Sequence, residues 1–189
     1  MPDHPVAYTT RMWLRAIVIV CVTVVSLVPA LAAPQDPFKA LELIKPNRVK
    51  AAKNFTVPTP DGKSLRLADY RGKVVFLNFW ATWCIPCKEE MPTMERLYQR
   101  FKTKGLVMLA VSVDAEGAQI VTPFVKEHKL TFPIGLDPKM ELALKYDVRG
   151  LPTSFLVDKK GNLIALAIGP RQWDSKAAHD LIEFLLKQG

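Results

Sequence analysis

The spacing of hydrophobic residues changes from segment to segment along the chain, and each spacing predicts an element. Residues 74–79 and 106–113 are short, nearly continuous apolar runs, typical of strands buried on both faces of a mostly parallel sheet. From Cys84 onward the apolar positions recur every three or four residues, so we expect a long helix that begins at or near Cys84 and ends before Gly105. The apolar positions of this helix are Met91, Met94, Leu97, Tyr98 and Phe101.

The remaining patterns predict two antiparallel pairs and three more helices. Residues 55–57 and 65–67 flank turn-forming residues and indicate a hairpin, and 154–157 and 163–168 indicate a second pair. Because strands and helices otherwise follow one another, we expect a mixed central sheet with helices on both faces, a three-layer α/β fold. The other expected elements are a helix near 118–128, a strand near 132–136, a helix near 139–146 and a closing helix at 175–187, capped by Asp174 or Ser175.

Composition and length fit a single globular domain. The chain has 189 residues, 49% of them hydrophobic and 23% charged, with no visible repeat or low-complexity tract. Its net charge is +8, and residues 1–32 hold only Arg11, Arg15 and Asp3, so about +7 belongs to the remainder. Such a surface would tolerate anionic membranes. The lysines are mixed with acidic residues and form no basic stripe with aromatics, so we expect no nucleic-acid binding, and we expect a monomer.

The N-terminal segment has the pattern of an export signal. Arg11 and Arg15 precede the uncharged apolar run 16–28, and small residues then occupy the −3 and −1 positions of a cut after Ala32. The alternative is an uncleaved membrane anchor, because 16–35 carries no charge and has roughly the ~20 residues that a spanning helix needs. Two prolines within that stretch count against the anchor.

The chain therefore divides into three expected parts. Residues 1–32 are a signal peptide or an uncleaved anchor, 33–52 are an N-terminal linker, and 53–189 are the folded domain. This division places the protein in the periplasm or cell envelope, either soluble or anchored through 16–35.

Two cysteines three residues apart, Cys84 and Cys87, are the candidate reactive groups. A structural disulfide between them would close a tiny loop and gain little stability, so a chemical role is favoured. A helix that begins at Cys84 would place this sulfur where free N–H groups and the helix dipole stabilise the reactive thiolate. Cys87 would lie one turn inside, so we expect Cys84 to attack a disulfide and Cys87 to resolve the mixed disulfide. The chain has no second cysteine pair, and His128 and His179 lack ligand spacing, so we expect no zinc site.

The segment NFWATWCIPCKEEMP at 78–92 resembles the active-site segment of the thioredoxin superfamily, in its TlpA/ResA-like exported branch. The resemblance runs from about Phe55 to the C-terminal helix. It implies a thioredoxin-like three-layer fold, in which 118–136 resembles the helix-strand insertion of this branch, and it implies no cofactor and no metal. The segment GLPT at 150–153 resembles the cis-proline loop of the superfamily. This implies a cis bond before Pro152 and a substrate-binding role for Leu151, whose backbone would pair with an extended client segment.

Two positions near the cysteines separate this branch from thioredoxin itself. Asn78 stands where thioredoxin has a buried Asp, and Glu90 matches a Glu that the branch places three residues after the second cysteine. Glu90 could move protons to and from the cysteines if burial raises its pKa, or it could be a first-turn carboxylate favoured by the helix dipole, and both interpretations stay open. Trp83 borders the expected nucleophile and is the candidate for partner contact, whereas core packing alone would account for Trp80.

The resemblance implies an exported thiol-disulfide oxidoreductase, and its relatives generally keep client cysteines reduced, as in cytochrome c maturation or copper-site assembly. The expected partners are client protein disulfides and a membrane thiol-reductant protein. A disulfide-forming oxidase is the nearest alternative, because the Ile85-Pro86 dipeptide does not decide the direction of electron flow. A peroxiredoxin-like peroxidase ranks lower, since Ala81 occupies the position of its required Thr or Ser. A Cu(I) carrier also ranks lower, since Met91 and Met94 have core-like spacing.

Overall fold

The computed structural model describes residues 36–188. The predicted signal peptide or anchor, 1–32, lies outside the described residues. Within the described residues, none of the helices is both long enough and apolar enough to cross a membrane.

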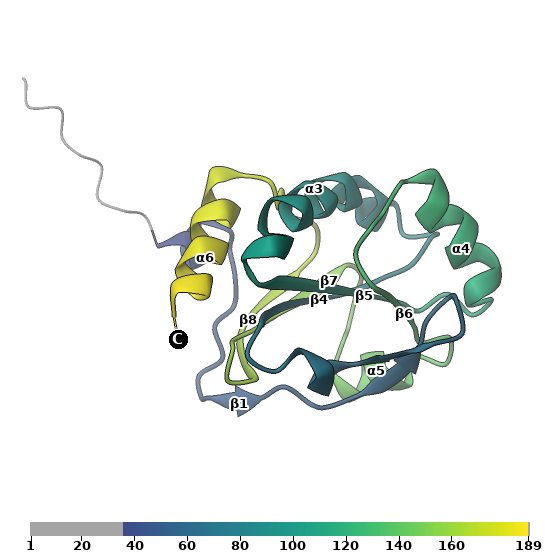
Figure 1. Cartoon of the computed structure of the whole chain (residues 1–189), viewed down its shortest axis with the longest axis horizontal. Helices are drawn as coiled ribbons and strands as arrows, with labels where there is room; N and C mark the ends of the chain where they lie inside the picture. The colour runs from purple at the N-terminus through teal and green to yellow at the C-terminus, as the bar shows by residue number, and fades with distance from the viewer. Residues whose placement is uncertain (1–35, 189) are drawn as a thin grey trace, which may run out of the picture. The chain divides into compact units, whose positions relative to one another are not determined.

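A six-stranded mixed sheet forms the centre of the domain, in the order β1-β8-β7-β4-β5-β6 (Figure 1). Strands β4, β5 and β6 are parallel to one another, whereas β7 runs antiparallel to β4, β8 to β7, and β1 to β8. Every residue of β4 is buried, which explains why this strand is a continuous apolar run rather than an alternating one. The strands are β1 Lys50–Ala51, β4 Val74–Trp80, β5 Leu106–Ser112, β6 Ile134–Leu136, β7 Thr153–Val157 and β8 Asn162–Ile168.

Helices cover both faces of this sheet, so the predicted three-layer fold is confirmed. Helices α3, α4 and α6 lie on one side in Figure 1, and α5 lies on the other. Successive residues of β4 point to opposite faces: Phe76 meets Trp173 on the α3 side, while Phe79 meets Tyr146 on the α5 side. The helices are α2 Pro37–Ala40, α3 Ile85–Phe101, α4 Ala118–Glu127, α5 Glu141–Lys145 and α6 Lys176–Lys187, with 3₁₀ turns at Leu67–Tyr70 and Lys102–Lys104.

The predicted helix ends are also confirmed. After α3 the chain tightens into a 3₁₀ turn and stops at Gly105, whose φ of 106° is readily available only to glycine. Helix α6 is capped by Ser175, whose hydroxyl accepts the backbone N–H of Ala178 at 3.3 Å.

The first predicted hairpin forms a separate two-stranded sheet, β2 Thr56–Pro58 with β3 Ser64–Arg66. It packs against β6 at Gly135. A Cβ atom at this glycine would lie 2.7 Å from Cγ2 of Val57 and 3.1 Å from Cδ2 of Leu65. Only a residue without a side chain allows the hairpin to approach the edge of the main sheet so closely.

The segment 33–52, interpreted from sequence as a linker, packs on the domain wherever it is described. Phe38 of α2 and Leu41 are buried, and the Phe38 ring meets Phe184 of α6 edge-on at 6.3 Å. Ile44 then bridges to Leu166 of β8, and β1 adds a strand to the same edge. Residues 36–52 are therefore part of the folded body, because Phe38 packs on α6 and both Ile44 and β1 pair with β8.

Candidate active site

The cysteine pair lies where the central strand passes into a helix. Strand β4 ends at Trp80, a short turn follows, and Cys84 is the N-cap residue of α3, as the sequence predicts. Cys84 and Cys87 form a disulfide, with their Cα atoms 5.3 Å apart. The backbone N–H of Cys87 donates to Sγ of Cys84 across 3.3 Å. The sulfur of Cys84 thus occupies the position of a capping acceptor, where a helix N-terminus stabilises negative charge.

The two cysteines differ in their access to solvent. Cys84 retains 6% of its surface and Cys87 retains none. On either side of Cys84, Trp83 and Ile85 are each 65% exposed and form an apolar rim around the sulfur. A reactant from solution therefore meets Cys84 first, between two large apolar side chains. Trp80 lies fully buried beneath, against Phe124 of α4 at 5.1 Å.

A buried carboxylate holds the turn that precedes Cys84. The two carboxylate oxygens of Asp114 accept the backbone N–H of Thr82 at 3.0 and 3.1 Å, and one of them accepts the Thr82 hydroxyl at 2.7 Å. The Ser112 hydroxyl donates to the other oxygen at 2.7 Å, so the fully buried carboxylate is well satisfied. Sequence reasoning missed Asp114. The sequence did contain a sign of its role: Ser112 and Asp114 are polar residues at the end of a buried strand, and that strand is the neighbour of the strand that leads to the cysteines.

The loop around Pro152 faces the disulfide. The Leu151–Pro152 peptide bond is cis, as expected, and Thr153 starts β7 in register with Phe79 of β4. Between this loop and the cysteines lies an open groove of about 490 Å³. The groove is lined by Trp83, Cys84, Ile85, Pro86, Met140, Val148, Arg149, Gly150 and Leu151. The structure thus brings Leu151 and Trp83 to one groove beside Cys84.

Glu90 is buried on the inner face of α3, one turn beyond Cys87. Only 2% of its surface is exposed, and burial raises the pKa of its carboxyl group to about 7. Three N–H donors oppose this rise by stabilising the charged form. Asn78 Nδ2 donates to Oε1 at 3.0 Å, while the Arg171 backbone N–H and Trp173 Nε1 donate to Oε2 at 3.2 and 3.1 Å. The carboxyl group can therefore exist in either protonation state near neutral pH.

The groups around Glu90 are themselves held in place. Asn78 also donates to the Ser154 hydroxyl at 3.0 Å, and its own carbonyl oxygen has no hydrogen-bond partner among the described residues. The backbone N–H of Trp173 donates to the Thr93 hydroxyl at 3.1 Å, and its indole ring packs edge-on against Phe76 at 4.6 Å. Sequence reasoning missed Trp173 and Arg171, because the loop that carries them gives no local sign of this contact.

The two histidines among residues 36–188 pack against aromatic side chains. His128 is exposed at the end of α4 and stacks on Phe124 at 4.0 Å, and His179 packs against Phe101 of α3. In the part of the chain that the structure describes, no three His, Cys, Asp or Glu side chains are grouped so that they could hold a metal ion.

The sequence is similar to a known protein family and to thiol-disulfide oxidoreductases. Residues 49–166 match the AhpC/TSA family, and this segment contains both cysteines, Glu90 and the Leu151–Pro152 loop. The thiol-disulfide oxidoreductase ResA of Bacillus cereus is 46% identical over 120 residues, covering 64% of this chain and 69% of that protein.

Two crystal structures extend the similarity to the fold. A thioredoxin-family thiol:disulfide interchange protein from Chlorobium tepidum TLS has a TM-score of 0.64 and 30% identity, covering 75% of this chain and 99% of that one. StoA from Bacillus subtilis has a TM-score of 0.58 and 33% identity, covering 71% and 98% respectively. The similarity therefore spans nearly the whole of both solved chains.

Proposed function

Since the chain belongs to the AhpC/TSA family within the thioredoxin superfamily and is a thiol-disulfide oxidoreductase, we propose that it is an exported reductase of client protein disulfides. The observation that carries this proposal is the asymmetry of the cysteine pair. Cys84 caps α3 and keeps contact with solvent, whereas Cys87 is fully buried one turn inside. In this proposal the sulfur of Cys84 reacts with the client, and the sulfur of Cys87 reacts only with that of Cys84.

In the proposed reaction the reduced protein begins with Cys84 as a thiolate. This thiolate attacks one sulfur of the client disulfide, forms a mixed disulfide, and releases the other client sulfur, which takes up a proton. Cys87 then loses its proton and attacks Sγ of Cys84. This step releases the second client thiolate, which is also protonated, and leaves the Cys84–Cys87 disulfide. The client gains two electrons and two protons. The cysteine pair loses two electrons and the proton of Cys87, and solvent supplies the second proton, because Cys84 reacts as a thiolate.

Glu90 is proposed as the proton acceptor for Cys87 in the second step. Both residues project from the same face of α3, because positions three apart lie one above the other on a helix. A carboxyl group with a pKa of about 7 can accept a proton and release it again near neutral pH. The alternative role, a carboxylate that simply favours the helix N-terminus, does not account for its burial among three N–H donors.

The groove between Cys84 and Leu151 is proposed as the place where the client chain lies. A client segment would extend along the backbone of Leu151 and pair with it like an added strand, which holds its disulfide above Cys84. Trp83 and Ile85 would contact apolar side chains next to the client cysteine, because burying such surfaces stabilises the encounter.

Repeated turnover requires a reductant that returns two electrons to the pair. We propose a membrane thiol-reductant protein for this step, and an export signal or anchor within 1–32 that brings both partners to the periplasm or cell envelope. Clients of the cytochrome c maturation or copper-site assembly type fit this arrangement, because both processes need cysteines that stay reduced in an oxidising compartment.

Trapping the mixed disulfide tests the proposal directly. Cys87→Ala leaves Cys84 able to attack but removes the resolving thiol, so client proteins should accumulate in covalent complexes that dithiothreitol releases. Cys84→Ala is the matched control and should trap nothing. The direction of electron flow is measured separately, by mixing reduced protein with an oxidised client recovered from the trap. An absence of trapped partners, together with an absence of disulfide reduction by the wild type, would rule out the reductase.

A further inference from the structure

Basic side chains gather at the end of the sheet opposite the disulfide. Strands β4 and β5 are parallel and both begin at this end, preceded by Lys73 and Lys104. The turn between β7 and β8 reaches the same end, because the backbone N–H of Gly72 donates to the Lys159 carbonyl at 3.1 Å. We call this surface the basic end and define it by Arg71, Lys73, Lys104, Lys159, Lys160 and Lys187.

The C-terminal helix joins the basic end through a side-chain contact. The ammonium group of Lys159 donates to the carbonyl of Leu186 at 2.8 Å, which places Lys187 beside the turn between β7 and β8. Four separate elements thus contribute cations to one end of the molecule. Such a cluster is invisible along the sequence, where these lysines are far apart and mixed with acidic residues.

The basic end carries more positive than negative charge within the described chain. None of its six cations forms an ion pair with a carboxylate among residues 36–188. Asp158 lies among these cations and keeps its negative charge, although its carboxylate accepts the backbone and side-chain N–H groups of Asn162 at 2.7 and 3.1 Å. Six cations and this one acid still leave an excess of positive charge. A concentrated positive field therefore faces solvent here.

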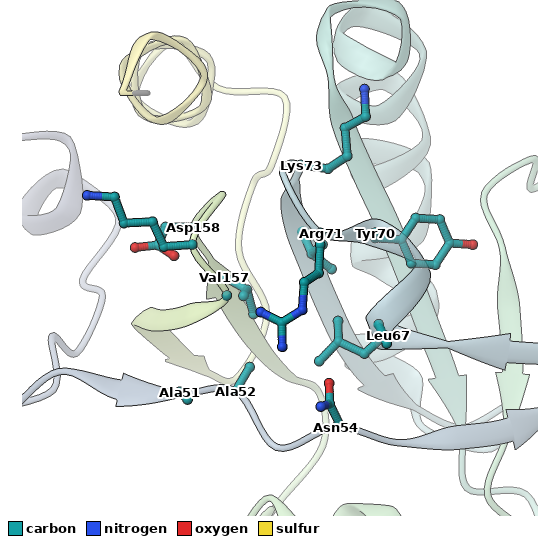
Figure 2. Close-up of a pocket in the computed structure, with 13 residues that line it drawn as sticks. Ala51, Ala52, Asn54, Leu67, Tyr70, Arg71, Lys73, Val157 and Asp158 are labelled. Atoms are coloured by element: carbon teal, nitrogen blue, oxygen red, sulfur yellow. The ribbon is translucent and has the colours of Figure 1, made fainter.

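The basic end also contains a small hollow that holds a guanidinium group. Figure 2 shows Arg71 pointing into a pocket beside Leu67, Asn54 and Val157, while Lys73 extends away from it. The pocket has a volume of about 130 Å³, and the Arg71 side chain is exposed at its edge. A phosphate group would fit this hollow and would satisfy the guanidinium donors, which match phosphate geometry.

From these features we propose that the basic end binds the surface of an anionic phospholipid bilayer. Five of its six cations are lysines, and they come from four elements. Point charges spread in this way suit a broad layer of mobile anions better than one shaped ligand. Arg71 would receive a lipid phosphate in its hollow. The choice of a membrane over other anionic surfaces rests on the proposed function, in which the export signal or anchor expected at 1–32 brings the chain to a membrane.

This orientation keeps the disulfide free for clients. Lys73 precedes β4 and Cys84 follows it, and a seven-residue strand is about 20 Å long. A bilayer at the basic end would therefore lie at the far side of the domain from the groove.

Vesicle cosedimentation of the full-length protein tests the proposal. The comparison is between vesicles of phosphatidylcholine alone and vesicles that also contain phosphatidylglycerol, so that any contribution of the apolar segment 16–35 is common to both. Because each cation near an anionic surface strengthens binding by about fivefold at low salt, we expect a preference of about a hundredfold or more for the anionic vesicles. Raising the salt concentration should remove this preference.

The test variant combines Arg71→Gln, Lys73→Gln and Lys160→Gln, three exposed positions outside the groove. It should lose most of the preference for anionic vesicles, by about a hundredfold in binding, while its disulfide reductase activity in solution stays at the wild-type level.

The matched control combines Lys63→Gln, Lys126→Gln and Lys139→Gln, which removes the same charge from exposed positions on other elements. It should bind anionic vesicles like the wild type. Equal loss of binding in both variants would overturn the proposed surface, because net charge alone would then explain the binding. Equal wild-type binding to both kinds of vesicle would also overturn it. Tighter wild-type binding to duplex DNA than to the anionic vesicles would also overturn it, in favour of a nucleic-acid surface.

Discussion

Asn78 of β4 donates a hydrogen bond to Glu90 of α3 across 3.0 Å, in the buried layer between the sheet and the helix. The residue at position 78 therefore influences the charge state of the Glu90 carboxyl group. An acid at position 78 would place a second carboxylate beside the first, whereas the amide supplies a donor that stabilises the charged form of Glu90.

Asn78→Asp should therefore make the protein more sensitive to alkaline pH. Two neighbouring buried carboxyl groups cannot both ionise easily, so the pair should keep one proton to a pH above the wild-type pKa of about 7. We expect the variant to lose about 2 kcal/mol more stability than the wild type between about pH 6 and pH 9. Urea unfolding at several pH values measures this. Asn78→Ala removes the donor without adding a charge and serves as control, and a wild-type pH dependence in Asn78→Asp would contradict the prediction.

Glu90 should also give the wild-type protein a pH-dependent stability. Its pKa is raised from 4.5 to about 7 by burial, so between these values the folded state binds a proton that the unfolded state has released. Stability is therefore greatest below about pH 4.5 with respect to this group, and about 3 kcal/mol is lost as the pH rises through about 7. Glu90→Gln keeps the shape and removes the titration. Guanidinium unfolding of the oxidised proteins should show the variant gaining on the wild type as the pH rises, and a constant difference would contradict this.

Trp173→Phe should shift the pH profile of activity. The change removes the indole N–H that donates to Glu90 at 3.1 Å but keeps an aromatic ring against Phe76. Loss of a donor to a carboxylate destabilises its charged form, so the pKa of Glu90 should rise by about one unit. If Glu90 accepts the Cys87 proton, the midpoint of the pH–rate profile for mixed-disulfide resolution should move to higher pH by about the same amount. Stopped-flow measurement of that step checks the shift, and a lower rate with an unshifted profile would indicate a structural role only.

Asp114→Asn should loosen the turn that positions Cys84. The carboxylate accepts three hydrogen bonds from Thr82, and an amide in its place would turn one acceptor into a donor facing donors. We expect a loss of about 2–4 kcal/mol in unfolding free energy and a lower rate of client attack by Cys84. Thr82→Val separates the contributions, because it removes only the hydroxyl. Unchanged stability in Asp114→Asn would show that the turn is held by other contacts.

Local pattern was sufficient to predict the cysteine site. The change from a continuous apolar run to a three-to-four-residue spacing locates the start of α3 at Cys84, and cap chemistry then distinguishes Cys84 from Cys87. Those features depend on neighbours in sequence. The resemblance of residues 150–153 added the cis bond at Pro152, which local pattern alone would assign as trans.

The environment of Glu90 could not be predicted in the same way. Trp173 lies 83 residues from Glu90 in the sequence, and their contact depends on how the loop after β8 folds back over α3. The role of residues 36–52 was missed for a related reason. Their proline and lysine content resembles a linker, and the burial of Phe38 depends on a helix at the other end of the chain.

The short outer strands of the sheet have a consequence for selectivity. A protein that takes up extended chains by backbone pairing is exposed to unwanted pairing wherever a long strand edge lies open. Here the outer strands β1 and β6 are two and three residues long, and the β2–β3 hairpin rests on β6 at Gly135. Neither edge offers much template for a foreign strand. Under the proposed function, an unfolded client would therefore pair most readily beside the disulfide, where pairing would lead to thiol-disulfide exchange and not to aggregation.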